Sequence, residues 1–193
     1  MKRVDEEKLI LRATRGDRAA AEVLIRGHQQ SLYSYMLRMT GQADVAEDVV
    51  QEAFVRVLSN LDRFDPRFRF STWVFTIAKR LYVNMCQRQK PMYNSDVVVT
   101  WQGASKRDER TEDQDAGEQI KDALQGALMG LPQEQREIVI LFHQQDWPIW
   151  LIAQHMDMPE GTVKSHLHRG RRRMRRLLEA QEKQMGVVRE VWS

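Results

Sequence analysis

The stretch PIWLIAQHMDMPEGTVKSHLHRGRRRMRR, residues 148–176, contains two helical patterns separated by a short turn. Pro148 and Pro159 each stand where a helix begins, and apolar residues recur from Val163 to Leu177 at offsets of 4, 3, 4 and 3. A short helix, a turn and an amphipathic basic helix form a helix-turn-helix, whose second helix enters the major groove of DNA. The stretch therefore predicts a DNA-binding unit.

The second helix of this pattern carries polar residues first and arginines afterwards. From Lys164 to Arg176 there are seven Lys or Arg and no acid. The early residues can reach base edges, whereas the arginines from Arg171 onward suit phosphates, which give affinity without sequence choice. An exposed basic helix end that binds nothing in particular is the alternative. The predicted DNA-binding residues are Thr162, Lys164, Ser165, His168, Arg169 and Arg172.

A second informative stretch, residues 63–90, mixes aromatic and basic side chains. Bases that have left the duplex stack on aromatic faces beside cations, with roughly 1–3 kcal/mol for each stack. Trp73 shares a helical face with Ile77 and Leu81, so a place in the core is its alternative, and some of the three phenylalanines in the preceding loop are needed to anchor that loop. The residues predicted to bind single-stranded DNA are Phe64, Phe68, Phe70, Trp73, Lys79 and Arg80.

The whole chain predicts an all-α fold of two small helical domains joined by a flexible linker, the second containing the helix-turn-helix. Breaks at residues 16–17 and 41–42 separate helices, and Ser71 or Thr72 is placed to cap a helix over residues 71–87. The acidic, aperiodic linker includes residues 97–100, which alone resemble a strand. The predicted divisions are 1–91 for the first domain, 92–117 for the linker, 118–180 for the second domain and 181–193 for a tail.

Composition narrows the function classes. The formal net charge is only +3, so the clustering of charge, more than its total, favours a nucleic-acid partner. Cys86 is the single cysteine, and neither a signal peptide nor an apolar run long enough to cross a bilayer is present, which predicts a cytoplasmic protein. His166 and His168 diverge by about 200° on a helix, which disfavours a metal site. With no catalytic pattern, we expect no enzyme, cofactor, metal or small-molecule substrate.

Four motifs in this order and spacing resemble those of bacterial sigma factors of the extracytoplasmic-function group (group IV). They are DVVQEAF at 48–54, FSTW at 70–73 with Ile77-Ala78, Leu131-Pro132 with Arg136-Glu137, and GTVKS at 161–165. The resemblance extends from about Leu9 to Leu178. It identifies residues 1–91 with sigma region 2 and residues 118–180 with sigma region 4.

The resemblance implies a role for each of these surfaces. On their own, three polar residues of one predicted helix indicate only a solvated face: Asp48, Gln51 and Glu52. The resemblance implies that they bind the β′ clamp helices of core RNA polymerase. It also implies that region 4 contacts the β flap. The loop from Asp62 to Phe70 would capture a flipped base of the minus-ten element. The helix-turn-helix would read the minus-thirty-five element.

The family also implies an anti-sigma factor that holds the protein inactive, in some cases at the inner membrane, in a stress or envelope response. The alternative function is a helix-turn-helix regulator of response-regulator type, because residues 162–166 also resemble its recognition helix. Such a protein would need an upstream phosphorylation pocket on alternating strands, where this chain shows helical patterns.

Overall fold

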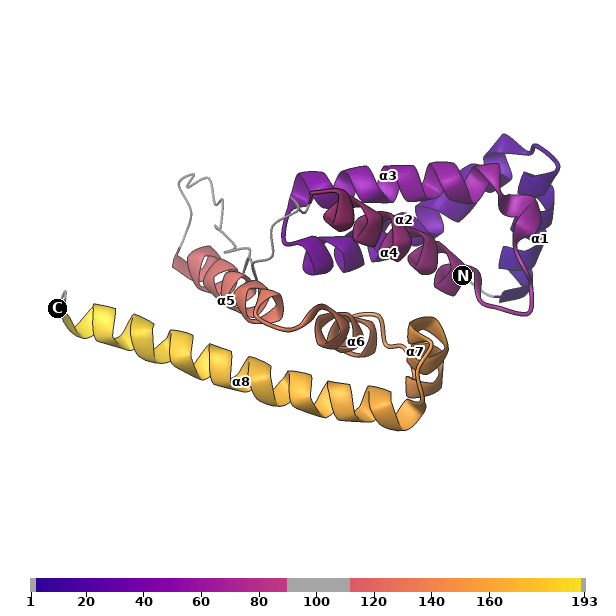
Figure 1. The fold of residues 1–193 in the computed structure, drawn as a ribbon. Coiled ribbons are helices and arrows are strands. Elements are labelled where there is room, and N and C mark those ends of the chain that lie inside the picture. The colour runs from indigo at the N-terminus through magenta and orange to yellow at the C-terminus, as the bar shows by residue number, and fades with distance from the viewer. Residues whose placement is uncertain (1–2, 90–111, 192–193) are drawn as a thin grey trace. The chain divides into compact units, whose positions relative to one another are not determined.

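The computed structural model describes the backbone of residues 3–89 and 112–191 and the side chains of residues 5–87 and 119–182. The elements in these ranges are all helical, and no strand occurs among them, which confirms the predicted all-α class (Figure 1). They are α1 (Arg3–Thr14), α2 (Arg18–Thr40), α3 (Ala43–Ser59), the 3₁₀ turn η1 (Leu61–Arg63), α4 (Phe70–Gln89), α5 (Glu112–Met129), α6 (Gln133–His143), α7 (Ile149–Met156) and α8 (Glu160–Val191). The chain divides into two compact units, Met1–Asp96 and Val97–Ser193.

Both ends of α2 lie at the breaks predicted from the sequence. The Asp17 carboxylate accepts a hydrogen bond from the Ala20 N–H at 3.1 Å and so caps the first turn. This bond, and after it the bond from Arg12, lowers the pKa of Asp17. Gly41 ends the helix in the left-handed conformation, with φ of 71°, and its N–H donates to the Leu37 carbonyl.

The core of the first unit is built by α2, α3 and α4, which pack against one another. The rings of Tyr35 and Phe75 lie 4.8 Å apart between α2 and α4. The buried side chains from these helices include Leu32, Met36 and Met39 of α2, Ala46, Val49, Val50 and Ala53 of α3, and Val74 and Ala78 of α4. Their spacing of three and four residues follows the helical pattern expected from the sequence.

The start of α4 differs from the prediction. The helix begins at Phe70, so Ser71 and Thr72 lie in its first turn and do not cap it. Phe70 is only 1% exposed, and its ring packs edge-on against the ring of His28 at 5.2 Å. His28 in turn meets the Glu6 carboxylate of α1 at 2.8 Å. Helix α4 therefore starts one residue earlier than predicted, at a residue whose side chain is buried in the core.

Two neighbouring residues of α6 hold the second unit together. The Arg136 guanidinium donates hydrogen bonds to the carbonyls of Leu128, Met129 and Leu131, which satisfies the end of α5. The Glu137 carboxylate lies 2.9 Å from His155 Nε2 of α7, and both side chains are almost fully buried. The Arg-Glu motif at 136–137 is thus explained by packing of α5, α6 and α7.

The predicted helix-turn-helix is formed by α7 and α8. Asp157 adopts the left-handed conformation, with φ of 51°, and its N–H donates to the Ala153 carbonyl. Pro159 then precedes the first residue of α8, while Val163, Leu167 and Gly170 face the core. The buried apolar face predicted for the second helix of the helix-turn-helix is therefore confirmed.

The outer boundaries of the second unit differ from those expected. Helix α5 begins at Glu112, inside the range 92–117 expected as linker. Helix α8 continues to Val191, beyond the predicted end at 180, and Leu177 and Gln181 of this helix pack against glycines of α5. The rest of the predicted linker, with residues 97–100, lies outside the described residues. Within the described residues, no helix combines the length and hydropathy that a bilayer crossing demands.

Candidate nucleic-acid interface

The exposed side of α8 brings four of the predicted DNA-binding residues together. Lys164, Ser165, His168 and Arg169 line one open hollow of about 450 Å³ on the helix surface. The Ser165 hydroxyl donates to the Gly161 carbonyl at 3.0 Å, so its oxygen is left to accept from a base or to meet a phosphate through water. The hollow presents two positive charges and two adaptable hydrogen-bonding groups, which is the chemistry of base-edge contact.

The remaining two predicted residues flank this hollow. Thr162 is half-buried, and its N–H closes the first turn of α8 on the Pro159 carbonyl at 2.9 Å. Arg172 is exposed and follows Ser165 by seven residues, which returns it to within about 20° of the same direction on the helix. Arg172 therefore lies on the same side of α8 as the residues that line the hollow, further toward the end of the helix.

Arg171 differs from the other arginines of the run. Its Nε donates a hydrogen bond to His143 Nε2 at 2.9 Å, and its guanidinium carbon lies 5.1 Å from the centroid of the Phe142 ring. Burial, and after it the charge of Arg171, lowers the pKa of His143. The sequence predicted a phosphate contact for all of these arginines, whereas Arg171 is bound to the end of α6.

In the first unit, the loop between η1 and α4 is organised by Asp65. Its carboxylate accepts hydrogen bonds from the Arg67 backbone N–H at 2.9 Å and from the Arg67 guanidinium, with Nη2 at 2.6 Å. The side-chain bonds of Arg67, followed by its backbone bond, hold the pKa of Asp65 below its usual value. The Phe68 N–H closes the turn on the Asp65 carbonyl at 3.1 Å. The loop is therefore a defined turn with Phe68 beside its closing bond.

The predicted single-strand residues of this loop fall into two groups. Phe68 is 44% exposed, and Phe64 and Trp73 are half-buried with their rings 5.3 Å apart. The Phe70 ring contacts both of these rings, with centroid distances of 5.4 Å to Phe64 and 5.9 Å to Trp73. Phe70 itself is fully buried. The prediction that Phe70 offers its face to a base is corrected, because its ring supports the other aromatics.

Two basic residues were predicted to accompany the aromatic loop. Arg80 is exposed and follows Trp73 by seven residues, so the two side chains share a face of α4. Lys79 is half-buried on the neighbouring face. An aromatic and cationic strip of the first unit thus consists of Trp73 and Arg80 on one face of α4, and the exposed Phe68 lies in the loop before it. Aromatic and cationic groups of this kind suit single-stranded DNA.

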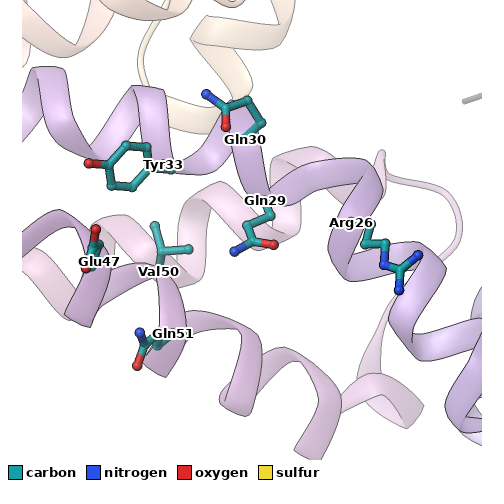
Figure 2. A pocket seen from close by; sticks show the side chains of 7 residues that line it. All are labelled: Arg26, Gln29, Gln30, Tyr33, Glu47, Val50 and Gln51. Atoms are coloured by element: carbon teal, nitrogen blue, oxygen red, sulfur yellow. The ribbon is translucent and has the colours of Figure 1, made fainter.

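The polar face of α3 is exposed as the sequence suggested. Asp48, Gln51 and Glu52 all point away from the core, and Glu52 pairs with Arg56 at 2.7 Å. Beside this face, α2 and α3 border a groove of about 460 Å³, in which Gln29 and Tyr33 lie across from Glu47 and Val50 (Figure 2). The residues that line it are Arg26, Gln29, Gln30, Tyr33, Glu47, Val50 and Gln51.

The sequence prediction missed the α2 side of this groove. Arg26, Gln29, Gln30 and Tyr33 recur at helical spacing opposite the buried residues of α2, and this pattern could have identified them. Among the residues whose side chains are described, no three His, Cys, Asp or Glu gather as they would around a metal ion.

Two parts of the chain match the families of known sigma factors. Residues 24–91, which include α3, the loop and α4, match Sigma-70 region 2. Residues 121–174, which include the helix-turn-helix, match Sigma-70 region 4. The two matches fall in the two compact units of the structure, in the order in which the motifs occur.

Two curated relatives are similar over most of their length. The ECF RNA polymerase sigma factor SigW of Bacillus subtilis is 30% identical over 179 residues, which cover 89% of this chain and 96% of SigW. The ECF RNA polymerase sigma factor SigL of Mycobacterium tuberculosis is 30% identical over 184 residues, covering 90% of this chain and 97% of SigL.

Two solved structures share the fold. CnrH, solved in complex with the cytosolic domain of CnrY, superposes with a TM-score of 0.70 at 20% identity and covers 91% of this chain and 98% of its own. The sigma factor RpoE of Bartonella quintana, solved in complex with the anti-sigma factor NepR, superposes with a TM-score of 0.62 at 22% identity. The match covers 82% of this chain and 96% of the RpoE chain. With both region matches and the relatives in agreement, this chain belongs to the ECF RNA polymerase sigma factors and is an alternative sigma factor.

Proposed function

We propose that this protein binds core RNA polymerase, directs it to promoters with two recognition elements, and helps to open the DNA at the second of them. One observation carries the proposal: the chain combines a duplex-reading helix-turn-helix in one unit with an exposed aromatic and cationic strip in the other. A repressor needs only the first. The catalysis of RNA synthesis remains with the polymerase, in keeping with a family of transcription initiation factors.

The second unit would read the minus-thirty-five element. Lys164, Ser165, His168 and Arg169 share one open hollow on α8, which supports their assignment to base edges and adjacent phosphates. Thr162, at the first turn, suits a phosphate beside the helix N-terminus, and Arg172 suits one further along the groove.

The first unit would hold the non-template strand of the minus-ten element after it has separated. The exposed ring of Phe68 and the half-buried rings of Phe64 and Trp73 offer faces for flipped bases. Arg80, and Lys79 beside it, supply charge to the backbone of the same strand. The Asp65–Arg67 bonds that define the turn favour this role, because a preformed loop loses less entropy when it binds.

The exposed face of α3 would bind the polymerase. Asp48, Gln51 and Glu52 form a polar, partly acidic patch that suits the β′ clamp helices, and the groove beside it adds depth to the same surface. The second unit would meet the β flap. We further propose regulation by an anti-sigma factor that covers both units, and the complex of the relative RpoE with the anti-sigma factor NepR supports a partner of this class. The protein would act in the cytoplasm, where polymerase and promoter DNA are.

The regulator of response-regulator type is not favoured. Its phosphorylation pocket needs alternating strands upstream of the helix-turn-helix, whereas the described part of that region is helical and matches Sigma-70 region 2.

Run-off transcription with purified core polymerase tests the proposal. Genomic promoter fragments are transcribed with and without the purified chain, and fragments with scrambled minus-thirty-five and minus-ten elements serve as controls. We expect transcripts that need both the protein and an intact promoter. The proposal fails if the protein gives no promoter-dependent transcript on any fragment.

A further inference from the structure

The contacts of Arg171 set it apart from the neighbouring Arg172. Arg171 reaches back to the end of α6, with Nε 2.9 Å from His143 Nε2 and the guanidinium above the Phe142 ring. The Phe142 and His143 rings contact each other edge to face at 5.0 Å. Arg172 is exposed, and within the described residues it has no hydrogen bond or ion pair. Two adjacent arginines of equal charge therefore have different surroundings.

The bond between Arg171 and His143 requires one protonation state of the histidine. A guanidinium only donates hydrogen bonds, so His143 Nε2 must accept and its proton must lie on Nδ1. The neutral ring is supported by its surroundings, since burial and the charge of Arg171 both lower the pKa of His143. A cationic arginine that donates to a neutral acceptor makes a charge-assisted and directional hydrogen bond.

The same turn of α8 lies tightly against α6. A Cβ on Gly170 would come within 2.9 Å of Val139 Cγ2, so the two helices are in tight contact there. Close packing at Gly170 fixes the distance between the helices, but a glycine has no side chain with which to fix rotation about the helix axis. Arg171, next in sequence, supplies such a directional contact.

We propose, as an inference that rests on the proposed DNA-binding function, that Arg171 is a positioning residue: it sets the rotation of α8 on α6 and does not bind phosphate. Side-chain tips lie about 6 Å from a helix axis, so a rotation of about 10° moves them by about 1 Å. Hydrogen bonds tolerate only a few tenths of an ångström around 2.9 Å. Loss of the Arg171 contact would therefore misalign Lys164, Ser165 and Arg169 against the bases.

The proposal is tested on holoenzyme made from core polymerase and the full chain. Binding is measured by fluorescence anisotropy on a promoter fragment that is active in run-off transcription, and on the same fragment with a scrambled minus-thirty-five element, over a range of KCl concentrations. The variants are Arg171→Ala and the matched control Arg172→Ala, with Arg171→Lys, His143→Ala and His143→Gln.

Arg171→Ala should reduce the ratio of specific to scrambled affinity about threefold to tenfold, as expected for one hydrogen bond, and leave the salt slope unchanged. Arg172→Ala should weaken both fragments alike and reduce the slope of log K against log [KCl] by about 0.9. Arg171→Lys keeps the positive charge but lacks the planar guanidinium that bonds to His143 and lies over the Phe142 ring. It should behave as the alanine variant does. His143→Ala should match Arg171→Ala, and His143→Gln, whose amide oxygen can accept, should restore the ratio.

Circular dichroism checks that each variant keeps its helix content, and Arg171→Lys decides the question if the alanine variant does not fold. The inference is overturned if Arg171→Ala or Arg171→Lys leaves the specificity ratio unchanged, or if Arg171→Ala reduces the salt slope as Arg172→Ala does. Failure of the proposed function is a separate result, in which wild-type holoenzyme does not distinguish the promoter from the scrambled fragment.

Discussion

Phe68 and Phe70 are two residues apart in the same loop, but their surroundings are different. Phe70 is enclosed by Phe64, Trp73 and the ring of His28, whereas Phe68 is 44% exposed beside the bond that closes the Asp65 turn. The sequence made both of them candidates for base stacking and expected some of the loop phenylalanines to be anchors, but residue type and spacing do not show which ones. Which ring is buried depends on His28, more than forty residues earlier in the chain. Such long-range packing leaves no local signal.

Replacing Phe68 with alanine should impair promoter opening and leave the fold intact. A lost base stack costs about 1–3 kcal/mol, so the open fraction should fall about fivefold or more. The measurement is fluorescence of 2-aminopurine placed in the minus-ten element, with holoenzyme. The thermal unfolding midpoint of the free chain should stay within a degree or two of wild type, a rough expectation for an exposed site.

Phe70→Ala is the matched control for this variant. Removing a buried phenylalanine costs about 3–5 kcal/mol, so its main effect should be a lower unfolding midpoint. Normal opening by the Phe68→Ala holoenzyme would contradict the assignment of the loop to base capture.

At the scale of the elements, most helix boundaries were predictable from proline and glycine. Pro132 and Pro148 stand at the N-caps of α6 and α7, and Gly41 ends α2 in the left-handed conformation. These residues restrict the backbone locally, so their effect can be read without tertiary structure. The start of α4 at the buried Phe70 and the end of α8 at Val191 were not predicted, because neither position carries a proline, a glycine or a capping residue that marks a boundary.

The contact between α6 and α8 can be tested at Gly170. Gly170→Leu should destabilise the second unit by about 1–3 kcal/mol, because its Cβ meets Val139, a buried and stiff β-branched residue. Leucine is the better helix former, so intrinsic propensity acts in the opposite direction and cannot explain a loss. Urea unfolding followed by circular dichroism measures the effect.

Gly161→Leu is the control in the same helix, since nothing lies within 4 Å of a Cβ at that position. It should leave stability unchanged or raise it slightly. Adding Val139→Ala to Gly170→Leu should recover part of the loss. Equal destabilisation at both glycines would show that close packing against Val139 is not the cause.

At the scale of the whole molecule, a substitution in one unit should impair the binding activity of that unit and leave that of the other unchanged. Lys164→Ala should weaken promoter-specific binding with little change in affinity for core polymerase, because Lys164 lies in the α8 hollow of the second unit. Asp48→Arg should do the reverse, because it inverts a charge on the exposed face of α3 in the first unit. Pull-down of core polymerase and anisotropy on promoter DNA separate the two effects.

Equal loss of both activities in the Lys164 variant would contradict the division of labour, and retained polymerase binding in the Asp48 variant would contradict the docking face. The residues on α8 were predicted from charge and spacing, whereas Asp48, Gln51 and Glu52 were predicted only from the resemblance to the sigma-factor family. The α2 side of the groove was missed, although its helical spacing marks an exposed face, because only the packing of α2 on α3 shows that this face borders a groove.

Helix α8 is one uninterrupted helix from Glu160 to Val191, and its length has a mechanical consequence. From Lys164 to Gln181 the helix extends about 26 Å, at 1.5 Å for each residue. Gln181 and Leu177 lie against Gly126 and Gly130 of α5. The helix therefore acts as a lever arm: a tilt of about 5° at that distant contact would shift the reading residues by about 2.3 Å, about two thirds of the spacing between neighbouring base pairs along DNA.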